Sequence, residues 1–281
     1  MNFLGIEEKY SNLKQAQSVI LPIPYEQTTS YISGTKYGPK GIIDASAYVE
    51  LYDEELDAEV YKKGIYTAPE LNFSGQVEQD FQLITDSVSD YLKKDKFVIS
   101  LGGEHSITFP VFRAFNEQVP NLSILQLDAH SDLRDSYEGS IFSHASVMSR
   151  IFEINPNIVQ LGIRSQCIEE AKFIKEKNIQ THYAHELRAD GFNSKILNTL
   201  SENVYLTIDV DYFDPSVMPA TGTPEPGGFL WYETLGFLKQ LFKMNNVVGM
   251  DIVELSPIKD MVHPDFFAAK LIYKLLGYKF L

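Results

Sequence analysis

A chain of 281 residues can bury a large hydrophobic core, and its 44% hydrophobic and 22% charged residues match an ordinary soluble globular protein. The net charge of -14 opposes binding to nucleic acid or anionic lipid and favours small cationic ligands, and the single Cys167 excludes an internal disulfide. Without a signal-peptide pattern or an apolar stretch long enough to span a bilayer, the sequence predicts a cytoplasmic protein with no membrane partner.

The beginning of the chain predicts a strand, a polar loop and a helix. The strand covers 18–23, and Gly38-Pro39 begins a helix that runs to Tyr48. We expect the loop 27–38 to be a plain surface connection, although it could line a substrate entrance. No flexible linker, low-complexity tract or repeat divides the sequence, so we predict one domain over residues 1–281.

From residue 79 onward, patterns typical of helices and strands alternate. This order indicates an α/β protein with a mostly parallel central sheet and helices on both faces. We predict strands at 96–101, 122–127, 157–162, 179–183, 204–209 and 246–252. We predict helices at 79–93, 106–115, 168–177, 191–200, 233–244 and 266–278, and one that ends near 152.

A glycine turn follows the strand 96–101 and leads to His105. Gly102 and Gly103 let the backbone turn sharply, so His105 lies at the carboxyl end of this strand. A phosphate-binding turn is excluded because no Gly-Lys-Ser/Thr sequence follows and Glu104 would repel an anion.

Three potential metal ligands follow the strand 122–127 at every second position. Alternate side chains of extended backbone project from one face, so Asp128, His130 and Asp132 can converge at the strand's carboxyl end. Ligands gather at that end in open α/β sheets. The alternative is that the two acids are ordinary loop residues and the histidine a hydrogen-bonded core residue.

Two later strands also end in acidic residues. Asp209 and Asp211 end the strand that begins at 204, and Glu254 follows the strand 246–252. The loop 214–228 contains four prolines that can hold nearby groups in fixed positions.

The gathered ligand types indicate a metal-dependent hydrolase. Four crowded carboxylates repel one another unless cations compensate, and two divalent ions match their formal charge. Mixed carboxylate and imidazole ligands suit Mn²⁺, Fe²⁺ or Zn²⁺ better than Ca²⁺ or a structural zinc. Two such ions can acidify a shared water, and hydrolysis is the reaction class that this chemistry favours.

Five motifs in order resemble those of the ureohydrolases, the arginase/agmatinase family. This resemblance implies an arginase-like three-layer α/β/α fold, two Mn²⁺ per subunit, hydrolysis of a guanidino group to urea and an amine, and a homo-oligomer, either trimer or hexamer. The motifs are Gly-Gly-Glu-His105-Ser, Asp128-Ala-His130-Ser-Asp132, Ser-His144-Ala, Asp209-Val-Asp211-Tyr-Phe-Asp-Pro with Thr-Gly-Thr223-Pro-Glu-Pro-Gly-Gly, and Asp251-Ile-Val-Glu254-Leu-Ser-Pro.

The resemblance also implies a role for each matching residue. His144 corresponds to the histidine that carries a proton to the departing amine, Glu254 to the acid that holds the guanidinium, and Thr223 to a hydroxyl near that group. Asp128 and Asp209 correspond to the bridging ligands. The six metal ligands are expected to be His105, Asp128, His130, Asp132, Asp209 and Asp211.

The residues that follow Asp132 give information about the substrate. Arginases have an Ile-Asn type pair there, whereas this chain has Leu133-Arg134-Asp135 and looks most like an agmatinase. We therefore expect agmatine hydrolysis to putrescine and urea in polyamine biosynthesis, with N1-aminopropylagmatine, giving spermidine, as the alternative. Arg134 could instead bind a carboxylate, as in guanidinobutyrate or formiminoglutamate, unless Asp135 neutralises it.

Two other classes of protein are less favoured. A binuclear metallophosphatase should show Gly-Asp and Gly-Asn-His-Glu/Asp motifs, which this sequence lacks. A non-catalytic binding protein on the same fold should have lost ligands, yet every ligand position is occupied.

Overall fold

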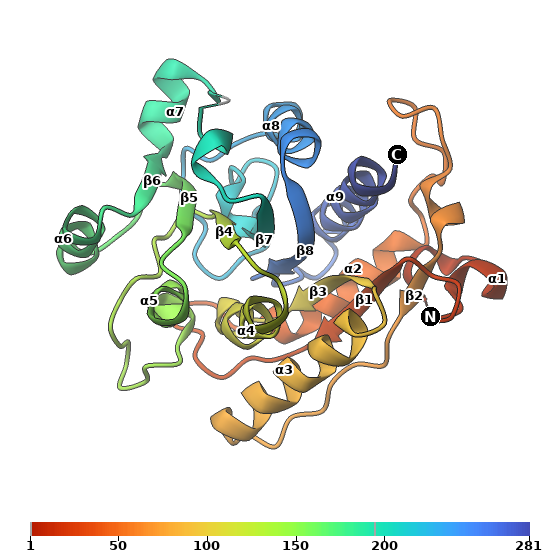
Figure 1. Ribbon diagram of the computed structural model, residues 1–281, viewed down its shortest axis with the longest axis horizontal. Coiled ribbons are helices and arrows are strands. Elements are labelled where there is room, and N and C mark those ends of the chain that lie inside the picture. The colour runs from red at the N-terminus through yellow and green to blue at the C-terminus, as the bar shows by residue number, and fades with distance from the viewer. Residues whose placement is uncertain (1, 194) are drawn as a thin grey trace.

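The computed structural model describes residues 2–193 and 195–281, and in these residues an eight-stranded sheet lies between two layers of helices (Figure 1). All of its strand pairings are parallel, in the order β2-β1-β3-β8-β7-β4-β5-β6. The strands are β1 Ser18–Ile23, β2 Ile65–Thr67, β3 Phe97–Gly102, β4 Leu122–Leu127, β5 Ile158–Ile163, β6 Gln180–Tyr183, β7 Asn203–Asp209 and β8 Asn246–Val253. This architecture confirms the predicted three-layer α/β/α fold.

Helices cover both faces of the sheet. Those in the described part of the chain are α1 Glu8–Ser11, α2 Gly38–Ser46, α3 Val77–Leu92, α4 Thr108–Gln118, α5 Val147–Ile154, α6 Ile168–Lys177, α7 Ala184–Asp190, α8 Trp231–Met244 and α9 His263–Phe280. No helix among these described residues is long and apolar enough to cross a bilayer.

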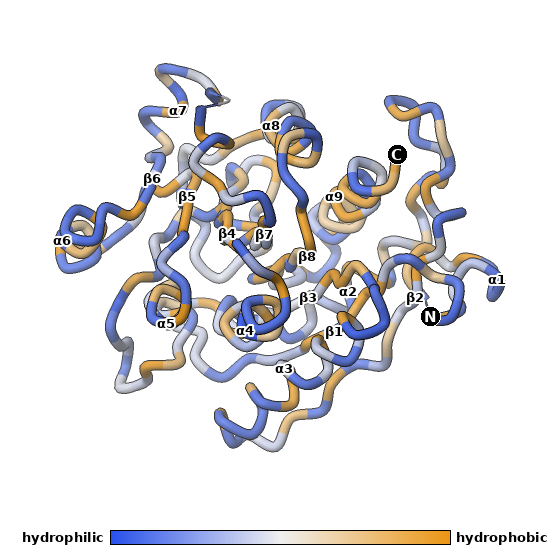
Figure 2. The backbone as a smooth tube through the Cα atoms, viewed as in Figure 1, coloured by the Kyte–Doolittle hydropathy of each residue, from blue (hydrophilic) through white to orange (hydrophobic). Residues whose placement is uncertain are grey.

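Two hydrophobic clusters, one on each face of the sheet, hold the layers together. Along β1, Val19 and Leu21 belong to the cluster that includes residues of α3, α4 and α5, whereas Ile20 belongs to the cluster with α2, α8 and α9. This alternation follows from the two-residue period of a strand. Figure 2 shows hydrophobic residues along the central strands, whereas the peripheral helix α6 is largely hydrophilic. Because one sheet joins strands from both halves of the chain, we propose that it forms a single domain.

The four middle strands of the sheet, β3, β8, β7 and β4, position the site. They are neighbours in the sheet and run parallel, so their carboxyl ends meet at one edge. His105, Glu254, Asp209 and Asp128 each lie at or just after the end of one of these strands. The sheet therefore brings together residues that are far apart in the sequence.

The predicted helix 191–200 is wrong. The structure instead forms α7 before it, and Gly191, with a φ of 76°, ends α7 by donating its N–H to Leu187 O. A glycine in this conformation commonly ends a helix rather than beginning one. Only a 3₁₀ turn at Leu197–Thr199 lies in the predicted range, and Ser194 falls outside the described residues. The short edge strand β2 was also not predicted.

A buried ion pair anchors α9 to the segment after α2. Lys274 is 3% exposed, and its Nζ lies 2.7 Å and 3.0 Å from the carboxylate oxygens of the fully buried Asp53 and 2.8 Å from Glu55 Oε2. We expect Lys274→Met to reduce the free energy of unfolding by about 3–5 kcal/mol, because it leaves Asp53 buried without its counter-charge. Chemical denaturation measures this loss. The double variant Lys274→Met/Asp53→Asn should recover part of it, and equal losses in both variants would contradict the explanation.

Candidate active site

A cavity of about 270 Å³ opens at the carboxyl edge of the middle strands. Asp128 does not line the cavity but is fully buried, and its Oδ2 lies 3.1 Å from His105 Nδ1. The structure thus brings all nine predicted site residues together. The eight that line the cavity are His105, His130, Asp132, His144, Asp209, Asp211, Thr223 and Glu254.

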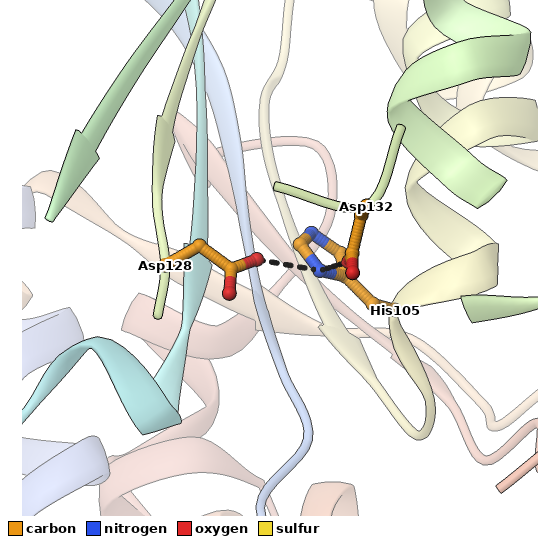
Figure 3. A group of neighbouring side chains, drawn as sticks. All are labelled: His105, Asp128 and Asp132. Carbon is orange, nitrogen blue, oxygen red and sulfur yellow. Dashed lines mark ion pairs between the residues drawn. The ribbon is translucent and has the colours of Figure 1, made fainter. Parts of the chain in front are cut away.

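His105 lies at the centre of a first group of potential metal ligands. Its Nδ1 is 3.1 Å from Asp128 Oδ2, 3.1 Å from Asp132 Oδ2 and 3.4 Å from Asp209 Oδ2. Figure 3 shows Asp128 and Asp132 directed toward this ring nitrogen. His105, Asp128 and Asp132 are close enough together to hold one metal ion.

The hydrogen bond of the second ring nitrogen of His105, Nε2, indicates which nitrogen can bind a cation. His105 Nε2 lies 3.0 Å from Thr207 Oγ1, whose hydroxyl donates to Asp251 Oδ1 at 2.6 Å. A hydroxyl has one hydrogen, so Thr207 must accept from His105, and Nε2 carries the ring proton. Nδ1 is then the nitrogen that faces the three carboxylates, and this buried atom makes no hydrogen bond in the structure. A ring nitrogen directed at three carboxylates in this way fits a bound cation.

His130 forms a second group with Asp211 and Asp128. Its Nδ1 lies 2.8 Å from Asp211 Oδ2 and 3.8 Å from Asp128 Oδ1. Asp128 therefore directs one oxygen toward each group, as a bridging ligand must. Asp209 connects the groups differently: one oxygen approaches His105, and the other accepts the Asp211 N–H at 2.8 Å.

The two groups contain more carboxylates than cationic side chains, and bound cations would balance this excess of negative charge. Burial, with a further contribution from the nearby Asp211 and Asp132, raises the pKa of Asp128 to about 7. Burial lowers the pKa of His130, but Asp211 outweighs this effect and raises it to about 11. Without cations, the crowded carboxylates therefore favour protonation of Asp128 and of His130, and bound metal ions would remove this need.

Glu254 lies where β8 ends and faces the same cavity. Its backbone has a φ of 66°, and its N–H donates to Gly103 O, while its Oε1 accepts the backbone N–H of His105 at 2.6 Å. Burial raises the pKa of Glu254 to about 8, although the hydrogen bond from His105 opposes this shift. The carboxylate lacks a cationic partner among the described residues, so a cationic ligand would satisfy it.

His144 begins a 3₁₀ turn, His144–Ser146, and lines the same cavity. Its Nδ1 lies 3.2 Å from Thr28 Oγ1, and its backbone N–H donates to the same oxygen at 3.1 Å. The Tyr137 ring packs against the imidazole in an edge-on arrangement, with centroids 5.7 Å apart. These contacts restrict the orientation of the ring.

The expectation that the loop 27–38 is a plain surface connection is wrong. Thr29, Ser30 and Ile32 line the cavity. The loop is held there by Glu104, which accepts the backbone N–H groups of Gln27 and Thr28, both at 2.6 Å. The sequence has no periodic signal for a contact of this kind, which joins segments about 76 residues apart.

Further lining residues that the motif reading missed follow β5. Ser165, Gln166 and Glu170 face the cavity. The carboxylate of Glu170 accepts the N–H groups of Leu133 at 2.9 Å and Cys167 at 2.7 Å. Their position after a strand's carboxyl end is the signal that could have identified them.

Arg134 also lines the cavity, and its charge is not neutralised by the residue next to it. Asp135 lies 3.4 Å from Arg150 instead, and the Arg134 guanidinium lies over the Tyr137 ring at 5.1 Å. The structure therefore does not support the alternative that Asp135 neutralises Arg134 through an ion pair.

Comparison with known proteins extends these observations. The model of the arginase family matches residues 16–277. The N(1)-aminopropylagmatine ureohydrolase of Synechocystis is 41% identical over 96% of this chain and 92% of its own length, and the agmatinase of Pyrococcus horikoshii is 34% identical over 95% and 93%. The crystal structure of agmatine ureohydrolase from Thermoplasma volcanium superposes with a TM-score of 0.90 and 30% identity, over 99% of this chain and 95% of that one.

Proposed function

Since the chain belongs to the arginase family and is a hydrolase that acts on guanidino groups, we propose that it releases urea from N(1)-aminopropylagmatine and leaves spermidine. The relative with this substrate in its name is 41% identical, against 34% for the named agmatinase. Agmatine, which we expected from the sequence, becomes the second candidate. It is supported by the agmatinase of P. horikoshii and by the T. volcanium structure.

The charge of the cavity favours a cationic substrate with more than one amine. N(1)-aminopropylagmatine carries a guanidinium at one end, a secondary amine in the chain and a primary amine at the other end. Besides the proposed metal ligands and Glu254, Glu170 is the acidic side chain among the cavity-lining residues. We propose that it attracts an amine of the substrate, since its carboxylate oxygens retain lone pairs beyond the two backbone bonds.

We propose that the six ligands hold two Mn²⁺. His105, Asp132 and one oxygen of Asp128 face one position, and His130, Asp211 and the other oxygen of Asp128 face the second, with Asp209 as the other bridge. Two such cations, when bound, lower the pKa of water and so supply a nucleophile near neutral pH. We also propose a cytoplasmic location and a trimeric or hexameric assembly.

The chain's own residues orient the substrate and move its proton. We propose that Glu254 binds the planar guanidinium through two parallel hydrogen bonds, which directs the guanidino carbon toward the ligand groups. Thr223 offers a hydroxyl from the proline-rich loop to the same end of the substrate. His144 delivers a proton to the amine nitrogen as it departs, which is the role of a general acid.

A substrate panel tests the proposed function. We expect Mn²⁺-loaded enzyme to release urea from N(1)-aminopropylagmatine with a kcat/KM at least about 10-fold above that for agmatine, a difference of about 1.4 kcal/mol, because the additional amine gains a charged partner. Arginine and 4-guanidinobutyrate serve as carboxylate-bearing controls for Arg134. A higher kcat/KM for agmatine would select the second candidate, and preference for 4-guanidinobutyrate would contradict both.

A further inference from the structure

We propose that Glu104, acting through Thr28, holds the neutral ring of His144 as the Nδ1–H tautomer, so that Nε2 is the nitrogen available in the cavity. Both are positioning residues, and neither is among the proposed ligands or substrate-binding groups. The tautomer follows from the hydrogen bonds alone. Its effect on turnover rests on the proposed function, in which His144 transfers a proton.

Glu104 is a fully buried carboxylate that accepts four hydrogen bonds. Its Oε2 accepts the backbone N–H groups of Gln27 and Thr28. Its Oε1 accepts the hydroxyl of Thr28 at 2.8 Å and that of Ser106 at 2.6 Å. Glu104 is 0% exposed, so these four bonds replace the water that an ionised carboxylate would otherwise need. An ionised carboxylate only accepts hydrogen bonds, and therefore both hydroxyls must donate to it.

Thr28 transmits this constraint to His144. The single hydroxyl hydrogen of Thr28 is directed to Glu104 Oε1, so Thr28 Oγ1 has only lone pairs left for other partners. It accepts the backbone N–H of His144 at 3.1 Å and lies 3.2 Å from His144 Nδ1. An unprotonated Nδ1 would face an acceptor, and hence Nδ1 must carry the ring proton.

The consequence is a histidine prepared to take up a proton on the side of the substrate. In the Nδ1–H tautomer, Nε2 has the free lone pair, and His144 lines the cavity. Nε2 takes up a proton from the water consumed in the hydrolysis and passes it to the amine nitrogen as the C–N bond of the guanidino group breaks, while Nδ1 keeps its own proton throughout. The opposite tautomer would place an N–H in the cavity and could not accept a proton there.

Nitrogen-15 NMR of histidine-labelled, metal-free protein tests the tautomer directly, without any catalysis. The spectrum is recorded over a series of increasing pH values, and the tautomer is taken from the range in which the His144 signal no longer changes with pH. The chain has six histidines, and the signal lost in His144→Gln identifies the ring. We expect Nδ1 to carry the proton in the wild-type protein. An Nε2–H ring would overturn the proposal whether or not the enzyme releases urea, so this outcome is separate from a failure of the proposed function.

Glu104→Gln makes a sharper test, because it should reverse the tautomer. The amide oxygen can keep the backbone bonds of Gln27 and Thr28, which leaves the NH₂ group to donate to Thr28 Oγ1. Thr28 can then turn its hydroxyl hydrogen toward His144 Nδ1, and we expect the ring proton to move to Nε2. An unchanged Nδ1–H signal in this variant would overturn the role of Glu104.

Kinetics of Thr28 variants test the link to turnover. We expect Thr28→Val to lower kcat by about 10- to 100-fold, a fraction of a full general acid–base contribution, with KM and Mn²⁺ content unchanged. Thr28→Ser should restore most of the loss because it keeps the hydroxyl. Thr35→Val is the matched control, since Thr35 is a buried threonine of the same loop whose hydroxyl bonds Glu26 away from His144.

These kinetic outcomes separate positioning from a general effect on the loop. Equal losses in Thr28→Ser and Thr28→Val, or an equal loss in Thr35→Val, would overturn the link between Thr28 and proton transfer. If Thr28→Val does not fold, Thr28→Ser and Glu104→Gln still decide the proposal through the NMR signal of His144.

Discussion

Asp128→Asn is expected to abolish urea release and to lower the content of bound Mn²⁺. Asp128 directs one carboxylate oxygen toward His105 and the other toward His130, so its loss affects both proposed metal positions. The decrease in kcat should exceed the about 10- to 100-fold that loss of a residue one contact removed from a metal typically causes. Metal analysis by mass spectrometry and a urea assay with N(1)-aminopropylagmatine measure the two effects.

A second buried aspartate provides the control for this variant. Asp80 is 1% exposed and accepts hydrogen bonds from Ser74 and Gly75 at the start of α3, away from the cavity. Asp80→Asn should change stability without changing the Mn²⁺ to protein ratio. If Asp128→Asn kept both its metal and its full activity, the assignment of Asp128 as a bridging ligand would be lost.

Glu254→Gln is expected to weaken substrate binding while leaving the metal content unchanged. Glutamine can still accept the backbone N–H of His105, which keeps the local structure, but it loses the charge that we propose to pair with the guanidinium. Breaking a buried charged pair costs about 2–5 kcal/mol, which corresponds to about 30- to 5,000-fold in kcat/KM. Steady-state kinetics with both candidate substrates measure this loss.

Glu254→Asp separates the charge of this side chain from its length. It keeps the negative charge but shortens the reach, so it should retain more activity than Glu254→Gln if attraction dominates. Since a substrate bound through its guanidinium needs Glu254 whichever amine it carries, both candidate substrates should be affected alike. Unchanged kinetics in Glu254→Gln would remove the proposed role.

The middle of the sheet and the ligand cluster could be predicted from the sequence because local pattern and chemistry agree there. β4 was predicted with its observed bounds from the apolar run that precedes Asp128, and the structure buries all six of its residues. The parallel arrangement then followed from the alternation of helices and strands. Residues at the ends of β3, β4, β7 and β8 were therefore expected to meet, and the structure brings them together.

The parts that were missed depend on contacts across the fold rather than on local pattern. Glu104 was interpreted only as a group that repels anions, whereas in the structure it fastens the loop 27–38 to the cavity. No periodicity marks such a loop, and its hydrogen bonds join the segment after β1 to the turn after β3, which are neighbours because these two strands pair. The choice between agmatine and N(1)-aminopropylagmatine could not be predicted from the sequence either, because it depends on the contacts between the substrate's amines and the charged side chains of the cavity.

The order of the strands also bears on how the protein is made. β3 and β4 are consecutive along the chain, yet β8 and β7 lie between them in the sheet. A ribosome-bound chain that ends before β7 therefore holds two sheet fragments with no strand to join them. Pairing over such long sequence separations is slow to form. The chain from residue 203 onward closes the sheet and delivers Asp209, Asp211 and Glu254, so a nascent polypeptide acquires the full set of proposed metal ligands only after β7 has been synthesised.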